Sequence, residues 1–211
     1  LEKVYDRKEK VGFDGLGESD KILLNWANWL CLRRKAHLMI EYFQKEMQPN
    51  ITEVLGLQVQ GHLENEDGDQ VVAYADIVCR WKGLDKPVIF DLKTSTRRYE
   101  EDAVKTSAQL ATYTHVFSDK YENTRNAGFL VIHKTIKKNR EKICSVCQFV
   151  GEGTHRKCNN TINNKRCNGE WNETIHPEAT GQILINEMPK KSEELVIENL
   201  DKINQSINTG I

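Results

Sequence analysis

The first half of the chain changes from a helical pattern of apolar residues to a strand pattern. Between residues 20 and 47, apolar side chains recur at spacings of three, four or seven, which predicts a helix ending before Pro49. Three apolar-rich segments follow, at residues 54–63, 71–81 and 88–94. Asp67-Gly68, between the first two of these segments, is a hairpin signal. We therefore expect three successive antiparallel strands.

The second half alternates between the two patterns and is interrupted by a polar region. We expect, in order, a helix at 101–117, a strand at 128–133, a strand at 182–186 and a helix at 192–208. Residues 137–178 are polar, basic and rich in cysteine. These patterns predict an α/β fold with a central mixed β-sheet flanked by helices. The predicted core consists of residues 1–136 and 179–211, with residues 137–178 as an insertion.

The strand at 88–94 contains charged residues that an apolar strand does not need. Asp91 and Lys93 are two residues apart and should share one face, with Leu92 turned into the core. Burying a carboxylate and an ammonium is costly unless they have partners. A divalent metal bound by Asp91 and a second acid, with Lys93 beside an attacking water, would use both groups. The alternative is an ion pair at the end of the strand.

Two further motifs flank this pair. Asp76 lies upstream within an apolar strand, and Gln109 and Tyr113 follow on the predicted helix. This ordered set resembles the PD-(D/E)XK nuclease superfamily, and within it the RecB-type and phage-exonuclease-like (YqaJ-like) branch. The resemblance covers roughly residues 20–135. Ala73 stands where the family often has Gly, and Asp91 stands where Glu is more common.

The resemblance implies a restriction-endonuclease-like core and metal-assisted hydrolysis of a phosphodiester. Asp76 and Asp91 would bind Mg²⁺ or Mn²⁺, with the main-chain carbonyl of Leu92 as a further ligand. The metal would neutralise charge on the phosphate and acidify a bound water. Lys93 would position that water or stabilise its hydroxide form.

The resemblance also assigns roles to residues around this centre. His37 on the first helix would add a metal ligand, and Glu53 at the start of the first strand matches an acid often found there. Gln109 and Tyr113 share one helical face and would line the substrate groove. The alternatives are a solvated histidine, a loop carboxylate, a core tyrosine and a surface glutamine. The residues beyond the catalytic strand that could reach DNA phosphates, or could simply be solvated, are Arg97 and Arg98.

Four of the six cysteines lie in one short window. Their pattern is Cys144-x2-Cys147-x10-Cys158-x8-Cys167. Four thiolates suit a closed, tetrahedral, structural Zn²⁺ site, and the metal would supply the folding energy of a segment with little apolar core. The alternative is an iron–sulfur cluster held by Cys31 and three of the four later cysteines.

Charge is distributed unevenly along the chain. Residues 131–170 hold nine Lys or Arg and three acids, a balance of +6, while the remainder carries −7. A basic lobe around the cysteines suggests a DNA clamp, and the alternatives are a protein-binding surface or a solvated charge run. A composition of 38% apolar and 29% charged residues is that of a globular protein. With no long apolar run and a charged N-terminal segment, we expect an intracellular protein that does not enter a membrane, in a bacterial cytoplasm or a phage-infected cell.

Together these features predict a metal-dependent deoxyribonuclease, most simply an exonuclease. DNA, double- or single-stranded, would be its substrate, and recombination, repair or phage DNA processing would be its setting. A recombination or single-strand-binding protein is an expected partner. The alternatives are a non-catalytic nucleic-acid-binding module with a zinc lobe, and an adaptor that uses the lobe on a protein partner.

Overall fold

The computed structural model describes residues 2–64, 70–151 and 157–189. It divides into two compact units, which are described separately. The sheet unit comprises residues 39–134 and 180–211, and the second unit comprises residues 1–38 and 135–179. The predicted turn at Asp67-Gly68 and the predicted helix at 192–208 lie outside the described residues.

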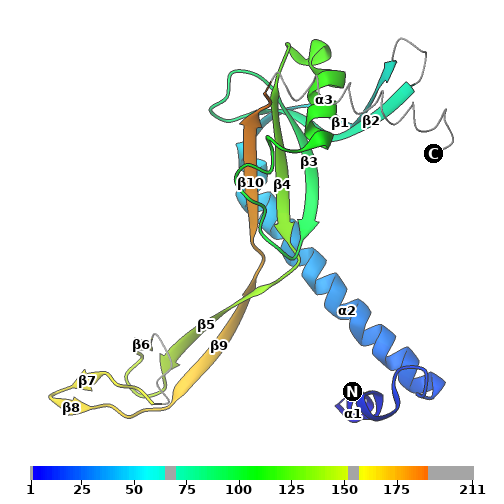
Figure 1. Ribbon diagram of the computed structural model, residues 1–211. Helices are drawn as coiled ribbons and strands as arrows, with labels where there is room; N and C mark the ends of the chain where they lie inside the picture. Colours follow the sequence, from blue (N-terminus) through cyan, green and yellow to red (C-terminus); the bar gives the residue numbers. More distant parts are fainter. Residues whose placement is uncertain (1, 65–69, 152–156, 190–211) are drawn as a thin grey trace. The chain divides into compact units, whose positions relative to one another are not determined.

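The sheet unit is built on a five-stranded sheet with the order β1-β2-β3-β4-β10 (Figure 1). β1–β2, β2–β3 and β4–β10 are antiparallel, whereas β3–β4 is parallel. The predictions of a mixed central sheet and of three successive antiparallel strands are therefore confirmed. The strands are β1 (Ile51–Glu64), β2 (Gln70–Trp81), β3 (Val88–Ser95), β4 (Asn126–His133) and β10 (Gly181–Glu187).

Helices cover both faces of this sheet. Successive residues of β3 and β4 point to opposite faces, so each strand contributes apolar side chains to both helix contacts. Ile89 and Val131 pack with α3 (Ala108–Phe117) on one face. Phe90 and Leu130 pack on the other face with the end of α2 (Glu18–Tyr42) and with η1 (Phe43–Met47). Each fully buried side chain of this size contributes about 1.5–3 kcal/mol to stability. The two short 3₁₀ helices are η2 (Gln48–Asn50) and η3 (Asp119–Tyr121).

Helix α3 begins later than the sequence pattern predicts. The prediction was a helix from 101 to 117, but residues 101–106 form turns and the helix starts at Ala108. Ser107 is the N-cap, and its hydroxyl accepts a hydrogen bond from the Leu110 N–H. A serine in this position satisfies an N–H at the helix start that has no intrahelical partner.

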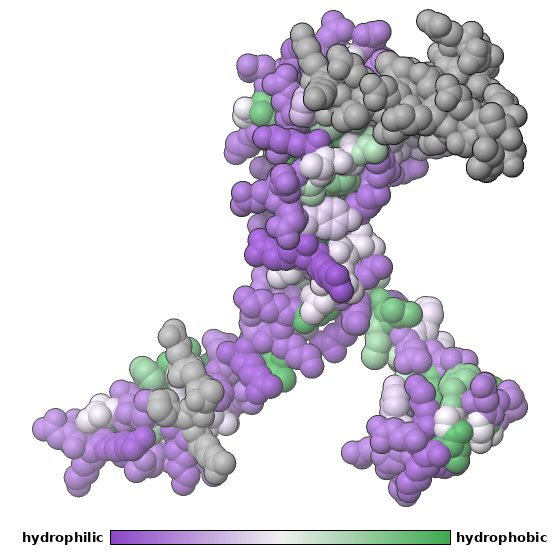
Figure 2. Space-filling view, in the orientation of Figure 1, coloured by the Kyte–Doolittle hydropathy of each residue, from purple (hydrophilic) through white to green (hydrophobic). Residues whose placement is uncertain are grey.

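In the second unit, residues 137–178 form an arm made of short strands. β5 (Lys137–Cys144) pairs antiparallel with β9 (Trp171–Glu178), and β6 (Val150–Gly151) pairs with the other edge of β5. β7 (Thr161–Ile162) and β8 (Lys165–Arg166) form a separate hairpin. The visible surface of the arm is mostly hydrophilic (Figure 2). The division into core and insertion at 137–178 stays a prediction.

The same unit contains α1 (Glu2–Val11) and most of α2. Val4, Leu16 and Leu24 form a small buried cluster that joins the two helices. No helix within the described ranges is long and apolar enough to cross a membrane.

Candidate functional site

The site begins where the ladder between β2 and β3 ends. The last residue pair of that ladder is Ile77 with Phe90. Beyond it, the Leu92 N–H donates to Oδ2 of Asp76 at 2.7 Å. The Asp76 side chain therefore satisfies a backbone donor that the ladder leaves unpaired. This hydrogen bond ties Asp76 to the residue that follows Asp91.

Asp91 lies at the centre of a polar network between β3 and α3. Its side chain is buried, and Oδ1 accepts hydrogen bonds from Gln109 Nε2 at 2.7 Å and from Tyr113 Oη at 3.2 Å. The Gln109 Nε2 atom also lies 2.7 Å from the Tyr113 hydroxyl oxygen. Lys93 Nζ donates to Gln109 Oε1 at 3.0 Å. Four of the residues selected from the sequence are thus joined in one network.

The second oxygen of Asp91 differs from the first. Oδ2 is buried and lies 2.8 Å from Lys93 Nζ, which is its charged partner. A buried carboxylate is costly without compensating positive charge, and a divalent cation would add to the compensation that Lys93 provides. The two carboxylates and the predicted carbonyl ligand of Leu92 are all oxygen donors, which Mg²⁺ and Mn²⁺ prefer. The residues present therefore fit a hard divalent cation.

Tyr113 remains a hydrogen-bond donor at neutral pH. Burial, together with the smaller effects of the Asp91 and Asp76 carboxylates, raises the pKa of Tyr113 to about 12. Because this pKa lies above the ordinary value of about 10, the contribution of the neutral hydroxyl to stability is complete below pH 10. That contribution is lost as the pH rises towards the folded-state pKa.

Leu92 does not point into the core as the strand alternation predicts. Its side chain is exposed, whereas Asp91 is buried. The alternation itself is correct, since Asp91 and Lys93 share one face and contact each other. The prediction was wrong about which face is covered at this point, because α3 packs over the face of Asp91.

One residue of the site was missed by the sequence analysis. Gln58 on β1 donates from Nε2 to Oδ1 of Asp76 at 2.7 Å. Its φ of +49° lies in the left-handed region, which a non-glycine residue seldom adopts. The flanking pairs Leu57–Ile77 and Val59–Ala75 place Gln58 across from Asp76 in the hairpin. Both Asp76 oxygens are therefore held by hydrogen bonds.

The structure does not bring Glu53 to this network. Glu53 pairs with Arg80 in the β1–β2 ladder, with Arg80 Nε 3.1 Å from Glu53 Oε2, and Arg80 also pairs with Glu122. Arg80 is four residues from Asp76, which is about 13 Å along a strand. The observed role of Glu53 is thus an exposed ion pair.

The other predicted site residues are His37, Arg97 and Arg98, which belong to other segments of the chain than the network residues. His37 belongs to α2 in the second unit, so its role as a metal ligand stays a prediction. Arg97 and Arg98 are exposed on the loop after β3. The Ser95 hydroxyl donates to the Arg97 carbonyl at 2.8 Å and accepts from the Arg97 N–H at 3.1 Å, which fixes the backbone of that loop.

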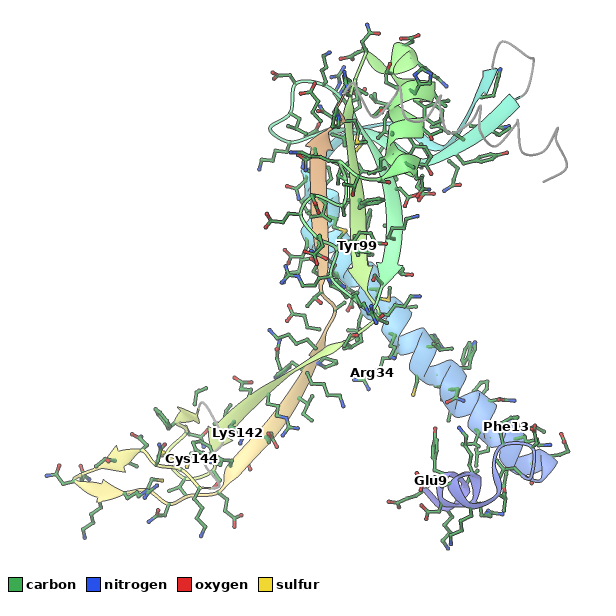
Figure 3. All side chains as sticks on the ribbon, viewed as in Figure 1. Glu9, Phe13, Arg34, Tyr99, Lys142 and Cys144 are labelled. Atoms are coloured by element: carbon green, nitrogen blue, oxygen red, sulfur yellow. The ribbon has the colours of Figure 1, made fainter. Side chains whose placement is uncertain are left out.

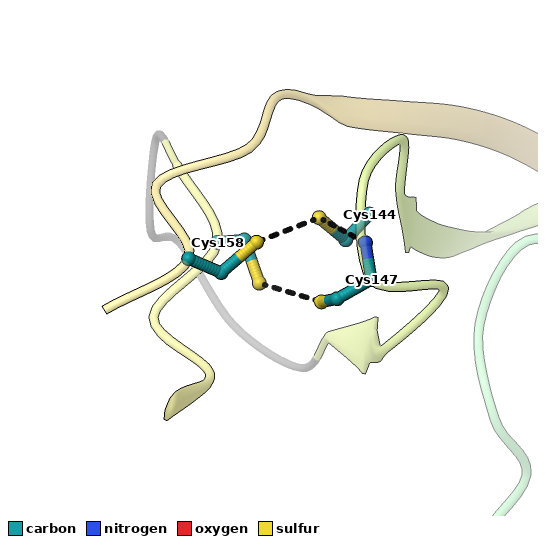
Figure 4. A group of neighbouring side chains, drawn as sticks. Cys144, Cys147 and Cys158 are labelled. Atoms are coloured by element: carbon teal, nitrogen blue, oxygen red, sulfur yellow. Dashed lines mark hydrogen bonds between the residues drawn. The ribbon is translucent and has the colours of Figure 1, made fainter. Parts of the chain in front are cut away.

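The four clustered cysteines come together at the tip of the arm (Figure 4). Their sulfur atoms all lie within 4.8 Å of one another, and no disulfide joins them. Cys144 Sγ is 3.6 Å from Cys167 Sγ, and Cys147 Sγ is 3.6 Å from Cys158 Sγ. A tetrahedral ZnS₄ site with Zn–S bonds of about 2.3 Å has sulfur–sulfur edges of about 3.8 Å. The geometry of the group fits a single tetrahedral metal ion.

The backbone around Cys144 favours its thiolate form. The N–H groups of Val146 and Cys147 donate to Cys144 Sγ at 3.4 and 3.5 Å. These hydrogen bonds, that from Cys147 first, together with the Cys147 and Cys167 side chains, lower the pKa of Cys144 to about 6, whereas burial raises the pKa of Cys158 to about 12. Gly169 is required here, since a Cβ at this position would lie 2.6 Å from Cys144 Sγ. Such outer contacts orient and stabilise metal-binding thiolates.

The iron–sulfur alternative fits this geometry less well. In a 4Fe–4S cluster each thiolate binds a different iron, and in a 2Fe–2S cluster two thiolates bind each iron, so the four sulfur atoms would not all lie as close together as those observed. Cys31 is exposed on α2 and is not a member of the group. All four clustered cysteines take part, whereas the alternative leaves one unused.

The chain was compared with known proteins. A family model described as the PD-(D/E)XK nuclease superfamily matches residues 4–206. No curated protein matches the chain. The family match extends over nearly the whole chain, including the residues of the arm.

Proposed function

Because the chain belongs to the PD-(D/E)XK nuclease superfamily, we propose that it is a metal-dependent deoxyribonuclease whose active centre contains Asp76, Asp91 and Lys93. The observation that supports this most strongly is the contact of the buried Asp91 Oδ2 with Lys93 Nζ at 2.8 Å, next to Asp76, which accepts a hydrogen bond from the Leu92 N–H. A RecB-type or phage-exonuclease-like role in recombination, repair or phage DNA processing follows from the order of the motifs. A recombination or single-strand-binding protein, in a bacterial cytoplasm or phage-infected cell, is the corresponding partner.

Each residue of the network has a separate task in this proposal. Asp76, Asp91 and the Leu92 carbonyl would hold Mg²⁺ or Mn²⁺, which would neutralise charge at the phosphate and acidify a bound water. Lys93 orients the attacking water, and Gln109 holds the ammonium by accepting its hydrogen bond at 3.0 Å. Tyr113 and Gln109 fix the Asp91 carboxylate through Oδ1, so that Oδ2 faces Lys93.

The arm would contain a structural Zn²⁺ ion bound by Cys144, Cys147, Cys158 and Cys167. The sulfur positions support one ion with no free coordination position, so this metal would stabilise the arm rather than take part in hydrolysis. Two different metals are thus proposed, each with the ligand type that it prefers.

Cleavage of end-labelled linear DNA and covalently closed circular DNA, with Mg²⁺ or Mn²⁺, tests the proposed activity. We expect the parent protein to degrade linear DNA and to leave circles intact, as an exonuclease does. Cutting of circles would keep the nuclease and replace the exonuclease by an endonuclease. If a folded, metal-loaded parent cuts neither DNA, the alternative of a non-catalytic nucleic-acid-binding module replaces the enzyme.

Gln58 provides a second test, through metal affinity. Replacing Gln58 with glycine removes the hydrogen bond to Asp76 and allows the left-handed backbone without strain. Loss of such an outer contact is expected to weaken Mn²⁺ binding by about tenfold or more. Isothermal titration with Mn²⁺ measures this. Gln60→Gly, two residues along the same strand, is the matched control, and equal affinities of the two variants would contradict the role of Gln58.

A further inference from the structure

The β5–β9 ribbon of the arm has two faces, which the ladder register defines. Alternate residues of a strand share a face, and directly paired residues share a face as well. The first face, called here the basic face, carries Lys138, Arg140, Lys142, Glu173, Ile175 and Pro177. The opposite face carries Lys137, Asn139, Glu141, Thr174, His176 and Glu178.

The side-chain contacts agree with this division. Arg140 Nη1 lies 3.4 Å from Glu173 Oε1, both on the basic face. On the opposite face, His176 Nε2 lies 3.3 Å from Glu141 Oε2, and Asn139 Nδ2 donates to Glu178 Oε2 at 2.6 Å. Each of these three contacts joins two residues of the same face.

The two faces have opposite formal charge. Three cations and one carboxylate lie on the basic face, and one cation and two carboxylates lie on the other. The carboxylate on the basic face engages Arg140 in an exposed pair, and pairs of this kind are weak. The glutamates of the opposite face are engaged by a histidine and an amide, so the negative charge there is largely retained.

The tip of the arm is less basic than its sequence suggests. Lys157, Lys165 and Arg166 lie there, but four thiolates around one Zn²⁺ would carry a formal charge of −2. Arg156, which contributes to the sequence count, lies outside the described residues. The ribbon rather than the cysteine lobe therefore presents the clearest positive surface. Figure 3 labels Lys142 on β5, close to Cys144 at the end of the strand.

The spacing of the cations suits a phosphate backbone. Residues two apart on a strand are separated by about 6.8 Å. Phosphates of one DNA strand rise by about 3.4 Å along the helix axis and also turn about it, so neighbouring phosphates are separated by about twice that rise, which matches the spacing of the cations. A two-stranded ribbon is also narrow enough for the major groove of B-DNA.

We propose that the basic face of the ribbon, through Lys138, Arg140 and Lys142, binds the DNA phosphate backbone, and that the opposite face does not. This inference rests on the proposed deoxyribonuclease function. It assigns the DNA contact to one face of the ribbon, whereas the sequence suggested that the whole basic lobe around the cysteines forms the contact.

Neighbouring lysines on opposite faces give a matched test. Lys138→Gln and Lys137→Gln remove the same charge one residue apart. Binding of a fluorescent duplex with a hydrolysis-resistant phosphorothioate backbone is measured by anisotropy, with the full-length, metal-loaded protein. Loss of one phosphate contact reduces the magnitude of the negative slope of log K against log salt by about 0.9. The loss of affinity between about 50 and 200 mM salt is then about 3.5-fold smaller. We expect this change for Lys138→Gln and an unchanged slope for Lys137→Gln.

A substitution that is expected to strengthen DNA binding tests the same face independently of the lysine variants. Glu173→Gln removes the only carboxylate of the basic face and is expected to tighten binding, whereas Glu178→Gln on the opposite face is expected to leave it unchanged. Equal effects of the two lysine variants, or of the two glutamate variants, would overturn the assignment to one face. If Lys138→Gln leaves DNA binding unchanged but weakens binding of polyglutamate, the face serves an acidic protein instead.

Cleavage by the parent separates the two proposals. If the parent degrades ordinary DNA and all four variants bind DNA with the affinity of the parent, the proposed ribbon contact is overturned and the proposed nuclease activity is retained. A parent that neither binds nor cuts DNA would overturn both.

Discussion

Asp91→Asn is expected to reduce the rate of DNA cleavage by at least about a thousandfold, or about 4 kcal/mol of transition-state stabilisation. The amide has nearly the shape of the carboxylate and keeps an acceptor for Gln109 and Tyr113. It loses the negative charge that a divalent cation requires and that pairs with Lys93. Folding should therefore survive while metal binding does not.

The measurement is single-turnover cleavage of end-labelled linear DNA with saturating Mg²⁺, together with circular dichroism of both proteins. Asp85→Asn is the matched control, since Asp85 is an exposed aspartate of the same unit. The control should cut at the parent rate. Retention of parent-like cleavage by Asp91→Asn would show that the catalytic centre lies elsewhere.

Cys158→Ser is expected to remove the zinc ion and unfold the tip of the arm. In zinc-finger peptides, a structural Zn²⁺ contributes about 10–16 kcal/mol of binding free energy, so a tip held by four thiolates has little else to keep it folded. Cys158 is fully buried, and its N–H donates to the Gly169 carbonyl at 2.9 Å. That hydrogen bond should be lost together with the metal.

Metal analysis and hydrogen exchange measure the two effects separately. The parent should hold one zinc ion per chain, and Cys158→Ser should hold far less and lose protection at the amides of 144–168. The sheet unit should keep its protection, because none of the four cysteines belongs to it. Cys31→Ser is the control: full zinc content and no iron would support the proposed site, whereas iron in the parent that Cys31→Ser removes would establish the iron–sulfur alternative.

The observed hairpin register is what places Gln58 across from Asp76, and the turn signal does not give that register. A two-residue turn at Asp67-Gly68 predicts Gln60 across from Ala75 and Gln58 across from Ile77. The observed pairs are Gln60 with Tyr74 and Leu57 with Ile77, a register shifted by one residue. The left-handed φ of Gln58 is a different matter, since no local pattern predicts it.

The sequence by itself determined which residues share a face and which cysteines gather in one group. Period-two alternation put Asp91 beside Lys93, helical spacing put Gln109 beside Tyr113, and the cysteine spacing predicted the group of four. The first two are short-range relations, which backbone geometry sets within a single element.

Tertiary structure alone decided the relations between elements distant in the chain. The parallel pairing of β3 with β4 and the packing of α3 determine that Asp91 is buried and Leu92 exposed. Glu53 forms an ion pair with its cross-strand neighbour Arg80, which is four residues along β2 from Asp76. The pairing of β5 with β9 adds Glu173 to the basic face and Glu178 to the opposite face, because it brings together residues that are more than thirty positions apart. Local patterns do not contain such long-range contacts.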